Sequence, residues 1–238
     1  MRTEYLDYQD GDLTCEAYVA YDDAKQGKRP CVLISHAWAG QTDFERRKAE
    51  ELAKLGYVAI AMDNYGKGVR GDAAGDNSHL MMPFMNDRGM LRKRLLAAVD
   101  MAKKLDVVDS TKIGAMGYCF GGLCALDLAR STCEGLQGAV SFHGLFVPPN
   151  LGKQAKISAK VLILHGYDDP MATPDSVLAV AKEMTEAGAD WQLHAYGHTV
   201  HAFTNPGANM PDRGILYNAA ADSRSWEAMK DFFAEVLG

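Results

Sequence analysis

A cysteine stands between glycines in the stretch "GYCFGG", residues 117–122, after an apolar run and before a helix-like pattern. A nucleophile on so sharp a turn is held in a strained backbone conformation. Glycine two residues before and after it removes collisions with the flanking strand and helix. The helix N-terminus would also favour the thiolate. The spacing Gly117-x-Cys119-x-Gly121 therefore predicts a nucleophile, the alternative being a small buried Cys119 with glycines that serve helix packing.

Two further residues follow later apolar runs and complete a catalytic pattern. Asp168 comes after "KVLILHGY", and His201 lies in "GHTVHAF" after "WQLHAY". Nucleophile, acid and histidine in this order are typical of α/β-hydrolase triads. Asp169 competes with Asp168, and the residues alone leave that choice open. His194 and His198 compete with His201 and would form a metal site with it, but no HExxH-like spacing supports one, so we predict no metal.

An acyl-transfer site also needs donors for the oxyanion. The backbone N–H of Phe120, directly after the cysteine, is directed to where an oxyanion would form. In α/β-hydrolases the loop after an early strand supplies the second donor. Here that loop is "HAWAG", residues 36–40, and its candidate is the Trp38 N–H. His36 in the same loop is either a packed or a functional histidine.

These residues must be positioned by alternating strands and helices. Short apolar runs, typical of buried parallel strands, are "CVLIS", "YVAIAMD", "KIGAMG", "GAVSFH" and "KVLILH", with "WQLHAY" as the last strand. Two strand-like pieces precede them at residues 3–7 and 13–19. Helices are predicted from the capping box Thr42-x-x-Glu45 to Gly56, and at residues 87–104, 120–130, 173–188 and 226–237. The alternation predicts a mostly parallel, doubly wound sheet in one domain, residues 1–238, with ligands beyond the carboxyl ends of the strands.

The bulk composition excludes several classes of function. The chain has 238 residues, 47% of them hydrophobic, enough for a core without metals or disulfides. Its net charge of −6 argues against a nucleic-acid partner. The N-terminus lacks the apolar centre of a signal peptide, and no run is long enough to span a bilayer. Five irregularly spaced cysteines predict free thiols. We expect a cytoplasmic monomer or small homo-oligomer.

The motifs "GYCFGG", "LHGYDDP" and "YGHTVHAF" resemble those of the dienelactone hydrolase family. The resemblance covers nearly the whole chain and implies an α/β-hydrolase fold without a large cap domain. It implies a triad of Cys119, Asp168 and His201, and it is the reason for preferring Asp168 to Asp169. It also implies hydrolysis of an ester or lactone with no metal or organic cofactor.

We also predict substrate contacts for Tyr118, His36, Phe203 and Asn205. The sequence departs from the founding enzymes at two of the family's positions. Their glutamate after the strand "VLIS" falls at Ala37, and their substrate-binding arginine aligns with Asn205. These departures leave the substrate open, and a dienelactone with its carboxylate is the less expected one.

Apolar side chains gather between a strand end and the next helix. They either fill gaps in the core or form an adaptable wall above Cys119. We expect Arg70 and Arg88, in the same part of the chain, to be solvated surface residues, with anion binding as the alternative. The apolar residues are Met81, Met82, Phe84, Met85 and Met90.

The sequence thus predicts a hydrolase that cleaves a carboxylic ester or lactone through a Cys-His-Asp triad and an acyl-thioester. One alternative is a weak or inactive α/β-hydrolase-fold protein that binds a small molecule. A nucleotide-dependent oxidoreductase is a second, but "GAMGYCFGG" does not match G-x-G-x-x-G. A redox pair of Cys119 with Cys124 is a third, and residues five apart on a helix point to nearly opposite sides.

Overall fold

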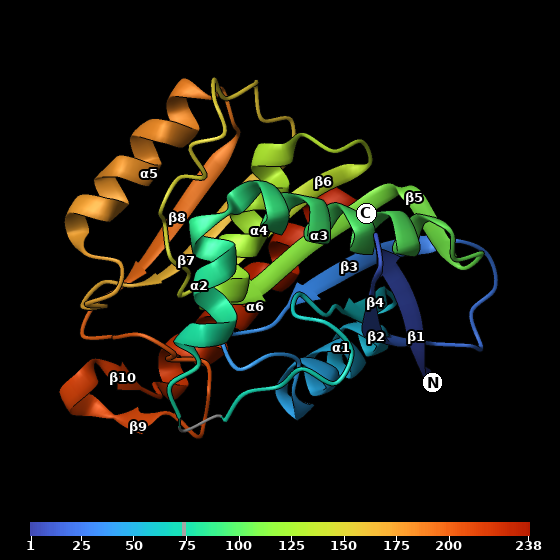
Figure 1. The fold of residues 1–238 in the computed structure, drawn as a ribbon, viewed down its shortest axis with the longest axis horizontal. Coiled ribbons are helices and arrows are strands. Elements are labelled where there is room, and N and C mark those ends of the chain that lie inside the picture. The colour runs from blue at the N-terminus through green and yellow to red at the C-terminus, as the bar shows by residue number, and fades with distance from the viewer. Residues whose placement is uncertain (73–74) are drawn as a thin grey trace.

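The computed structural model describes residues 1–72 and 75–238, which form a mostly parallel sheet between two layers of helices (Figure 1). The strand order is β1-β2-β4-β3-β5-β6-β7-β8. Pairing from β3 outward to β8 is parallel, and β4 is parallel to β3, whereas β1–β2 and β2–β4 are antiparallel. The strands are β1 (Arg2–Asp10), β2 (Leu13–Tyr21), β3 (Arg29–Ser35), β4 (Val58–Ala61), β5 (Val108–Tyr118), β6 (Leu136–Phe142), β7 (Lys160–Gly166) and β8 (Trp191–Tyr196).

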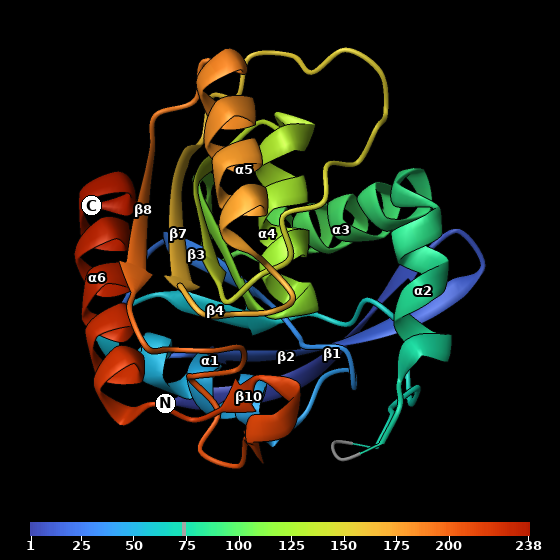
Figure 2. The ribbon, with the colours of Figure 1, turned by 90° about the vertical axis from the view of Figure 1, so that its left-hand side faces the viewer.

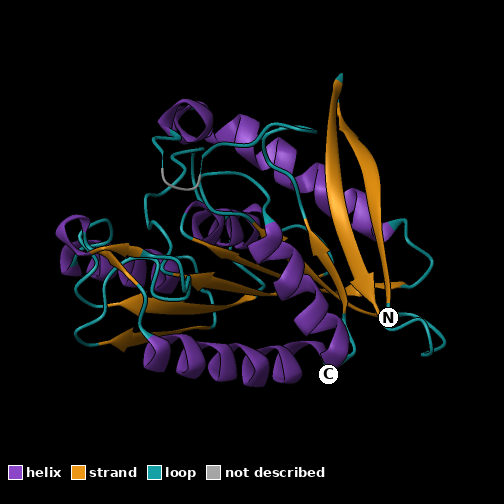
Figure 3. Ribbon diagram, turned by 90° about the horizontal axis from the view of Figure 1, so that it is seen from below, coloured by secondary structure: helices purple, strands orange, loops and turns teal. Residues whose placement is uncertain are grey.

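Helices cover both faces of this sheet. Buried residues of α1 and α6 pack on one face, and those of α3, α4 and α5 pack on the other. Figure 2 shows β7 and β8 lying between α6 and α5, and Figure 3 shows the β1–β2 hairpin turned steeply away from the other strands. The helices are α1 (Asp43–Leu55), α2 (Ser78–Asn86), α3 (Arg88–Lys103), α4 (Phe120–Ser131), α5 (Pro174–Glu186) and α6 (Ala219–Leu237).

The helix signals of the sequence act as predicted. Thr42 and Glu45 form a reciprocal capping box at the start of α1, with the Thr42 N–H donating to Glu45 Oε2 at 2.8 Å. Gly56 ends that helix in the left-handed region, at a φ of 105°. Pro174 is the first residue of α5, where its missing N–H costs no helical hydrogen bond.

Three features differ from the expectation. Helix α2 precedes α3 and was not predicted, because Pro83 interrupts its pattern. Helix α6 begins at Ala219, seven residues before the predicted start, where Asn218 caps it through the Ala221 N–H. A two-stranded ribbon, β9 (Asn209–Met210) and β10 (Ile215–Leu216), was also missed, because two-residue strands carry no periodic signal.

The carboxyl ends of β3, β5, β6, β7 and β8 meet at one edge of the sheet, since these strands are parallel neighbours. This is the edge where ligands bind in doubly wound sheets. It brings together the loops that carry Trp38, Cys119, His143, Asp169 and His201. Within the described residues, no helix has the length and apolar character that crossing a membrane would require.

Candidate active site

Cys119 occupies the turn between β5 and α4 in a strained backbone conformation. Its φ is 56° and its ψ is −116°, a region that side chains other than glycine rarely adopt. The thiol is partly exposed, whereas Cys124 five residues later is fully buried. The strain and the exposure together match what a nucleophile on a strand-to-helix turn requires.

The two flanking glycines are needed for steric reasons. A Cβ on Gly117 would lie 2.2 Å from the Gly121 carbonyl oxygen, and a Cβ on Gly121 would lie 2.2 Å from the Ser35 carbonyl oxygen. Both contacts are with backbone atoms, which cannot move aside cheaply. The predicted reason is confirmed for Gly117, which avoids the flanking helix α4, whereas Gly121 avoids β3 and not the flanking strand β5.

His201 pairs with Asp169 and not with Asp168, which corrects the predicted acid. His201 Nδ1 lies 2.7 Å from Asp169 Oδ2, and both side chains are buried. Asp169 Oδ1 accepts the Met171 N–H at 2.8 Å, so its carboxylate is fixed at both ends. The Asp168 side chain is 50% exposed and lies 3.8 Å from Nδ1 of the fully exposed His198. After β7, the first aspartate is directed to solvent and the next is directed inward.

The second ring nitrogen of His201 faces the cysteine. No described nitrogen or oxygen atom forms a hydrogen bond with the buried Nε2. Burial by itself lowers the pKa of His201, but its interactions with Cys119 and with the Asp169 carboxylate raise the pKa to about 10. The surroundings of His201 therefore favour the protonated ring, which lies next to the nucleophile turn.

The loop that carries His201 is fixed by the small ribbon that the sequence did not reveal. The His201 N–H donates to the Gly214 carbonyl at 2.9 Å, and the Leu216 N–H donates back to the His201 carbonyl at 3.1 Å. The Asn218 N–H donates to the Phe203 carbonyl at 3.1 Å. The signal in the sequence was the pair Pro211 and Gly214, which bounds a turn.

The loop after β3 is built around a buried neutral histidine. His36 Nδ1 donates to the Ala37 carbonyl at 2.6 Å, and His36 Nε2 accepts the Asn64 N–H at 3.1 Å. Burial lowers the pKa of His36 to about 4. Tyr65 holds the next peptide, since its hydroxyl donates to the Trp38 carbonyl at 2.9 Å. His36 is fully buried, so its predicted substrate contact is corrected to a structural role.

The two predicted oxyanion donors keep their N–H groups free of protein acceptors in the described part of the chain. Phe120 is the first residue of α4, where an N–H has no intrahelical partner. In the other loop, the Ala37 carbonyl accepts from both His36 and the Gly40 N–H. Because a trans peptide directs its C=O and N–H oppositely, these two bonds fix the direction of the Trp38 N–H.

Of the other predicted substrate contacts, Tyr118 and Phe203 are buried. Tyr118 is buried on the α1 and α6 side, with its ring 4.8 Å from that of Phe44, because strand alternation turns it away from Cys119. Phe203 is fully buried against His143. Asn205 is exposed, and its Oδ1 accepts the Gly207 N–H at 2.9 Å within a local turn. The assignments of Tyr118 and Phe203 are corrected, whereas that of Asn205 stays a prediction.

The side chains of the methionine-rich segment and of the two arginines differ in burial. Met81, Met85 and Met90 are partly buried against the core cluster that Cys119 also borders, whereas Met82 is 42% exposed. Arg88 is buried and donates twice to Asp127, at 2.7 and 2.9 Å, so the expected surface position is wrong. Arg70 is partly exposed and lies 3.5 Å from the buried carboxylate of Asp63.

His143 is a site residue that the sequence reasoning missed. It follows β6 directly, and its ring is buried with its Nδ1 3.2 Å from the Cys119 nitrogen. Its ring centroid lies 5.1 Å from that of His201. The available signal was its position at the end of the predicted strand "GAVSFH", at the same edge as the triad.

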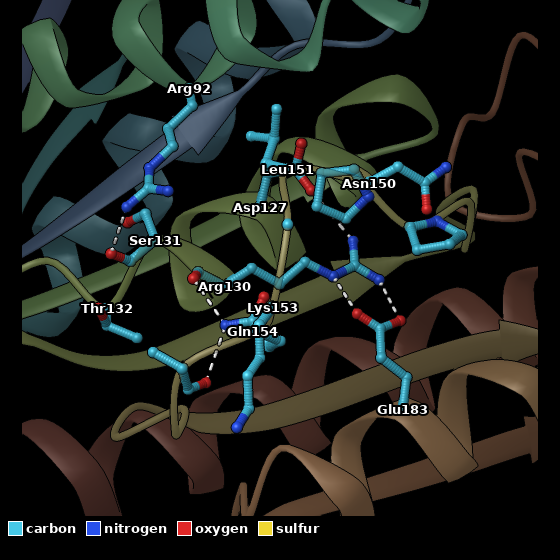
Figure 4. A pocket seen from close by; sticks show the side chains of 14 residues that line it. Arg92, Asp127, Arg130, Ser131, Thr132, Asn150, Leu151, Lys153, Gln154 and Glu183 are labelled. Carbon is cyan, nitrogen blue, oxygen red and sulfur yellow. Dashed lines mark hydrogen bonds and ion pairs between the residues drawn. The ribbon is translucent and has the colours of Figure 1, made fainter.

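A separate pocket of about 240 Å³ lies at the other end of α4 (Figure 4). Arg130 there donates to both Glu183 oxygens at 2.7 Å and to Asp127 at 3.0 Å. Arg92 donates to the Ser131 carbonyl at 3.0 Å. The buried charges of this pocket are thus paired within the protein, about 15 Å along the helix from Cys119.

A mostly parallel sheet with a strained nucleophile turn, and with a histidine and a carboxylate on later strand ends, defines an α/β-hydrolase. The chain belongs to the dienelactone hydrolase family, whose sequence profile matches residues 15–237. It is a hydrolase that acts on ester or lactone bonds, as its family membership establishes.

Three similar proteins illustrate this membership. The crystal structure of a dienelactone hydrolase-like promiscuous phosphotriesterase from metagenomic libraries has a TM-score of 0.93 and 36% identity, covering 100% of this chain and 99% of that one. A putative carboxymethylenebutenolidase of Aquifex aeolicus is 27% identical over 87% of this chain and 89% of its own. An uncharacterised protein of Caenorhabditis elegans is 35% identical over 63% of this chain and 96% of its own.

Proposed function

We propose that the chain hydrolyses a carboxylic ester or lactone with Cys119 as nucleophile, His201 as base and acid, and Asp169 as the carboxylate that orients His201. The observation that carries this proposal is the buried 2.7 Å contact between His201 Nδ1 and Asp169 Oδ2, with Nε2 left to face Cys119. A carboxylate at Nδ1 holds the tautomer in which Nε2 can exchange a proton with the nucleophile.

The reaction has two steps, formation of the acyl-thioester on Cys119 and its hydrolysis. The Cys119 sulfur forms a bond to the carbonyl carbon, the N–H groups of Phe120 and Trp38 hold the oxyanion, and the His201 proton passes to the departing alkoxide. Water then loses a proton to His201 as its oxygen attacks the acyl-thioester. The carbon–sulfur bond breaks, and the products are a carboxylic acid and the regenerated Cys119–His201 pair.

The substrate class follows from the surroundings of the site. Asn205 replaces the cation by which the founding enzymes bind a substrate carboxylate, and its amide oxygen is already used by Gly207. Partly buried thioethers of the α2 segment border the same cluster as Cys119. Both features favour a neutral ester or lactone with an apolar group. A comparison of neutral and carboxylate-bearing lactones tests this, and preference for the carboxylate would contradict it.

Replacement of the nucleophile is the primary test. Cys119→Ala is expected to reduce turnover of p-nitrophenyl esters by at least about 10³-fold, because no acyl-thioester can form, while circular dichroism stays unchanged. Cys133→Ala is the matched control, since Cys133 is the other partly exposed thiol. Iodoacetamide followed by peptide mapping should label Cys119 first.

Undiminished turnover by Cys119→Ala would refute the assignment. Absent turnover by the parent protein, with retained ligand binding, would favour a non-catalytic binding protein instead. Mass spectrometry of a quenched reaction adds a direct readout, because an acyl adduct on the Cys119 peptide is expected.

A second candidate activity is hydrolysis of phosphotriesters. The 36% identity to the promiscuous metagenomic phosphotriesterase, over the whole of both chains, favours it. A thiolate can attack phosphorus in the same place as a carbonyl carbon, since the oxyanion donors serve either. A dialkyl aryl phosphotriester assayed with the parent protein and with Cys119→Ala tests the activity. Turnover equal in both would exclude the cysteine from it.

The setting in which the chain acts is also a proposal. We infer that residues 1–238 work as one domain on a small molecule, without nucleic acid, as a monomer or small homo-oligomer in the cytoplasm. The five cysteines, all free thiols, support a reducing compartment. Size-exclusion chromatography with light scattering and fractionation of cells measure these properties.

A further inference from the structure

The ring of His143 occupies the space between the nucleophile turn and the loop of the triad histidine. His143 follows β6 at a φ of 37°, and its N–H donates to the Leu164 carbonyl at 2.8 Å. The residue is 2% exposed. A side chain held in an unusual backbone conformation at a strand end, inside a site, indicates a specific role.

Both ring nitrogens of His143 are engaged. The Cys119 N–H donates to Nδ1 at 3.2 Å and is shared with the Phe142 carbonyl at 3.1 Å. Because Nδ1 accepts, the proton of the neutral ring lies on Nε2, which donates to Thr204 Oγ1 at 2.8 Å. With no nitrogen free, His143 does not itself exchange protons with a substrate.

The ring also contacts the triad histidine. The centroids of His143 and His201 are 5.1 Å apart, with the two planes at 70°. Burial and the neighbouring charge of His201 hold the pKa of His143 well below its usual value. The ring therefore stays neutral beside a protonated His201, and it keeps Nδ1 as an acceptor for Cys119.

We propose that His143 is a positioning residue that connects the Cys119 turn to the His201 loop, through the Cys119 N–H on one side and Thr204 on the other. This inference rests on the proposed function, since it assigns the ring a part in aligning the same two groups. Thr204 lies three residues after His201 and is itself buried, so a bond to it restrains the loop that carries the triad histidine. The ring thereby aligns a sulfur and an imidazole that arrive from different strands.

Four single variants and one double variant test the connection. His143→Leu removes both hydrogen bonds and is expected to lower kcat by about 10²-fold with KM within about twofold, because misalignment of reacting groups acts on the chemical step. His143→Asn tolerates positive φ and keeps an acceptor near the Nδ1 position, so it should recover part of the loss. Thr204→Val should lower kcat by about two- to tenfold, the contribution of one neutral hydrogen bond. Thr204→Ser, which keeps the hydroxyl, should match the parent.

The double variant distinguishes positioning from general packing. His143→Asn is too short to reach Thr204, so Thr204→Val should have no further effect on kcat in that background. Equal effects of Thr204→Val in both backgrounds would overturn the proposal, as would full kcat in His143→Leu. Should His143→Leu fail to fold, the Thr204 pair and the double variant still decide the question.

The outcomes also separate this inference from the proposed function. If Cys119→Ala keeps its turnover, the triad proposal fails whatever the His143 variants do. If Cys119→Ala is inactive but His143→Leu and Thr204→Val have parental kcat, the positioning role alone is wrong. Thermal unfolding of each variant shows whether it is folded. If activity is lost only because structure is lost, neither His143→Asn nor Thr204→Ser should show the expected rescue.

Discussion

At the scale of single residues, two adjacent aspartates have opposite surroundings. Asp169 is buried with both carboxylate oxygens engaged, by His201 and by the Met171 N–H. Asp168 is half exposed and 3.8 Å from an exposed histidine. A buried carboxylate can hold a histidine in one tautomer, whereas an exposed one is screened by water. Because Asp168 and Asp169 are adjacent but differ in burial, the same substitution at each gives a test and its matched control.

Asp169→Asn is expected to lower kcat/KM by on the order of 10³–10⁴-fold, because the amide cannot stabilise the His201 imidazolium and favours the wrong tautomer. Asp168→Asn should stay within about twofold of the parent, as expected for a solvated side chain. Steady-state hydrolysis of a p-nitrophenyl ester by both variants measures this. A large loss in Asp168→Asn with none in Asp169→Asn would reverse the assignment.

At the scale of elements, the start of α4 approaches the end of β3 more closely than a side chain permits. Gly121 has no room for a Cβ, which would lie 2.2 Å from the Ser35 carbonyl and 2.7 Å from the His36 carbonyl. The close approach sets the Cys119 turn beside the loop that carries Trp38. The distance between this helix and this strand therefore determines how nucleophile and oxyanion donors are arranged.

Gly121→Ala should push α4 away from β3, which destabilises the fold by about 1–3 kcal/mol and lowers kcat by about 10²-fold. Gly197→Ala is the control, since a Cβ there meets no atom within 4 Å. Thermal unfolding and ester turnover of both variants are the measurements. Parental stability and turnover in Gly121→Ala would show that the close approach is not needed.

At the scale of the whole molecule, several histidines are buried in neutral form. Burial lowers the pKa of His36 to about 4 and lowers those of His143 and His165. Neither ring nitrogen of His165 has a hydrogen-bond partner among the described residues. These side chains lie at the carboxyl edge of the sheet, where the site is. The stability of the whole molecule in mild acid therefore depends on this region.

The free energy of unfolding should therefore fall as the pH decreases from about 6.5 towards 4. In that range the unfolded state binds protons that the folded state excludes, which costs about 1.4 kcal/mol per pH unit for each fully buried neutral histidine. His201, whose pKa is raised to about 10, has the opposite effect: its contribution to stability is complete below the unfolded pKa of about 6.5 and is lost as the pH rises above it. Urea unfolding at pH 6.5, 6.0 and 5.5 measures the effect in the range where the buried neutral histidines outweigh His201.

The exposed His198 provides the control for this pH dependence. Its side chain is fully exposed, so His198→Gln should leave the slope unchanged. Carboxylates remain largely ionised down to pH 5.5, and the slope above that pH reports mainly on histidines. Stability that is constant or rises on acidification would contradict the neutral, buried state of these rings.

The sequence by itself determined the fold class, the nucleophile turn, the capping of α1 and the proline at the start of α5. These features depend on local rules: period-two and apolar runs for strands, small residues where backbones approach, and side chains that cap helix ends. Cys119 and His201 could be identified because each follows its own strand, and parallel strands bring their carboxyl ends together.

Only the tertiary structure decided which neighbour faces inward. A strand or turn can point residue i or residue i+1 to the core, and packing of the β9–β10 ribbon and of the His201 loop selected Asp169 over Asp168. Packing of the sheet also explains why Tyr118 points into the core and why His143, which no sequence motif marked, lies in the site. Contacts between segments distant in sequence depend on the register and the close packing of the whole sheet, and these are not written in any short stretch of residues.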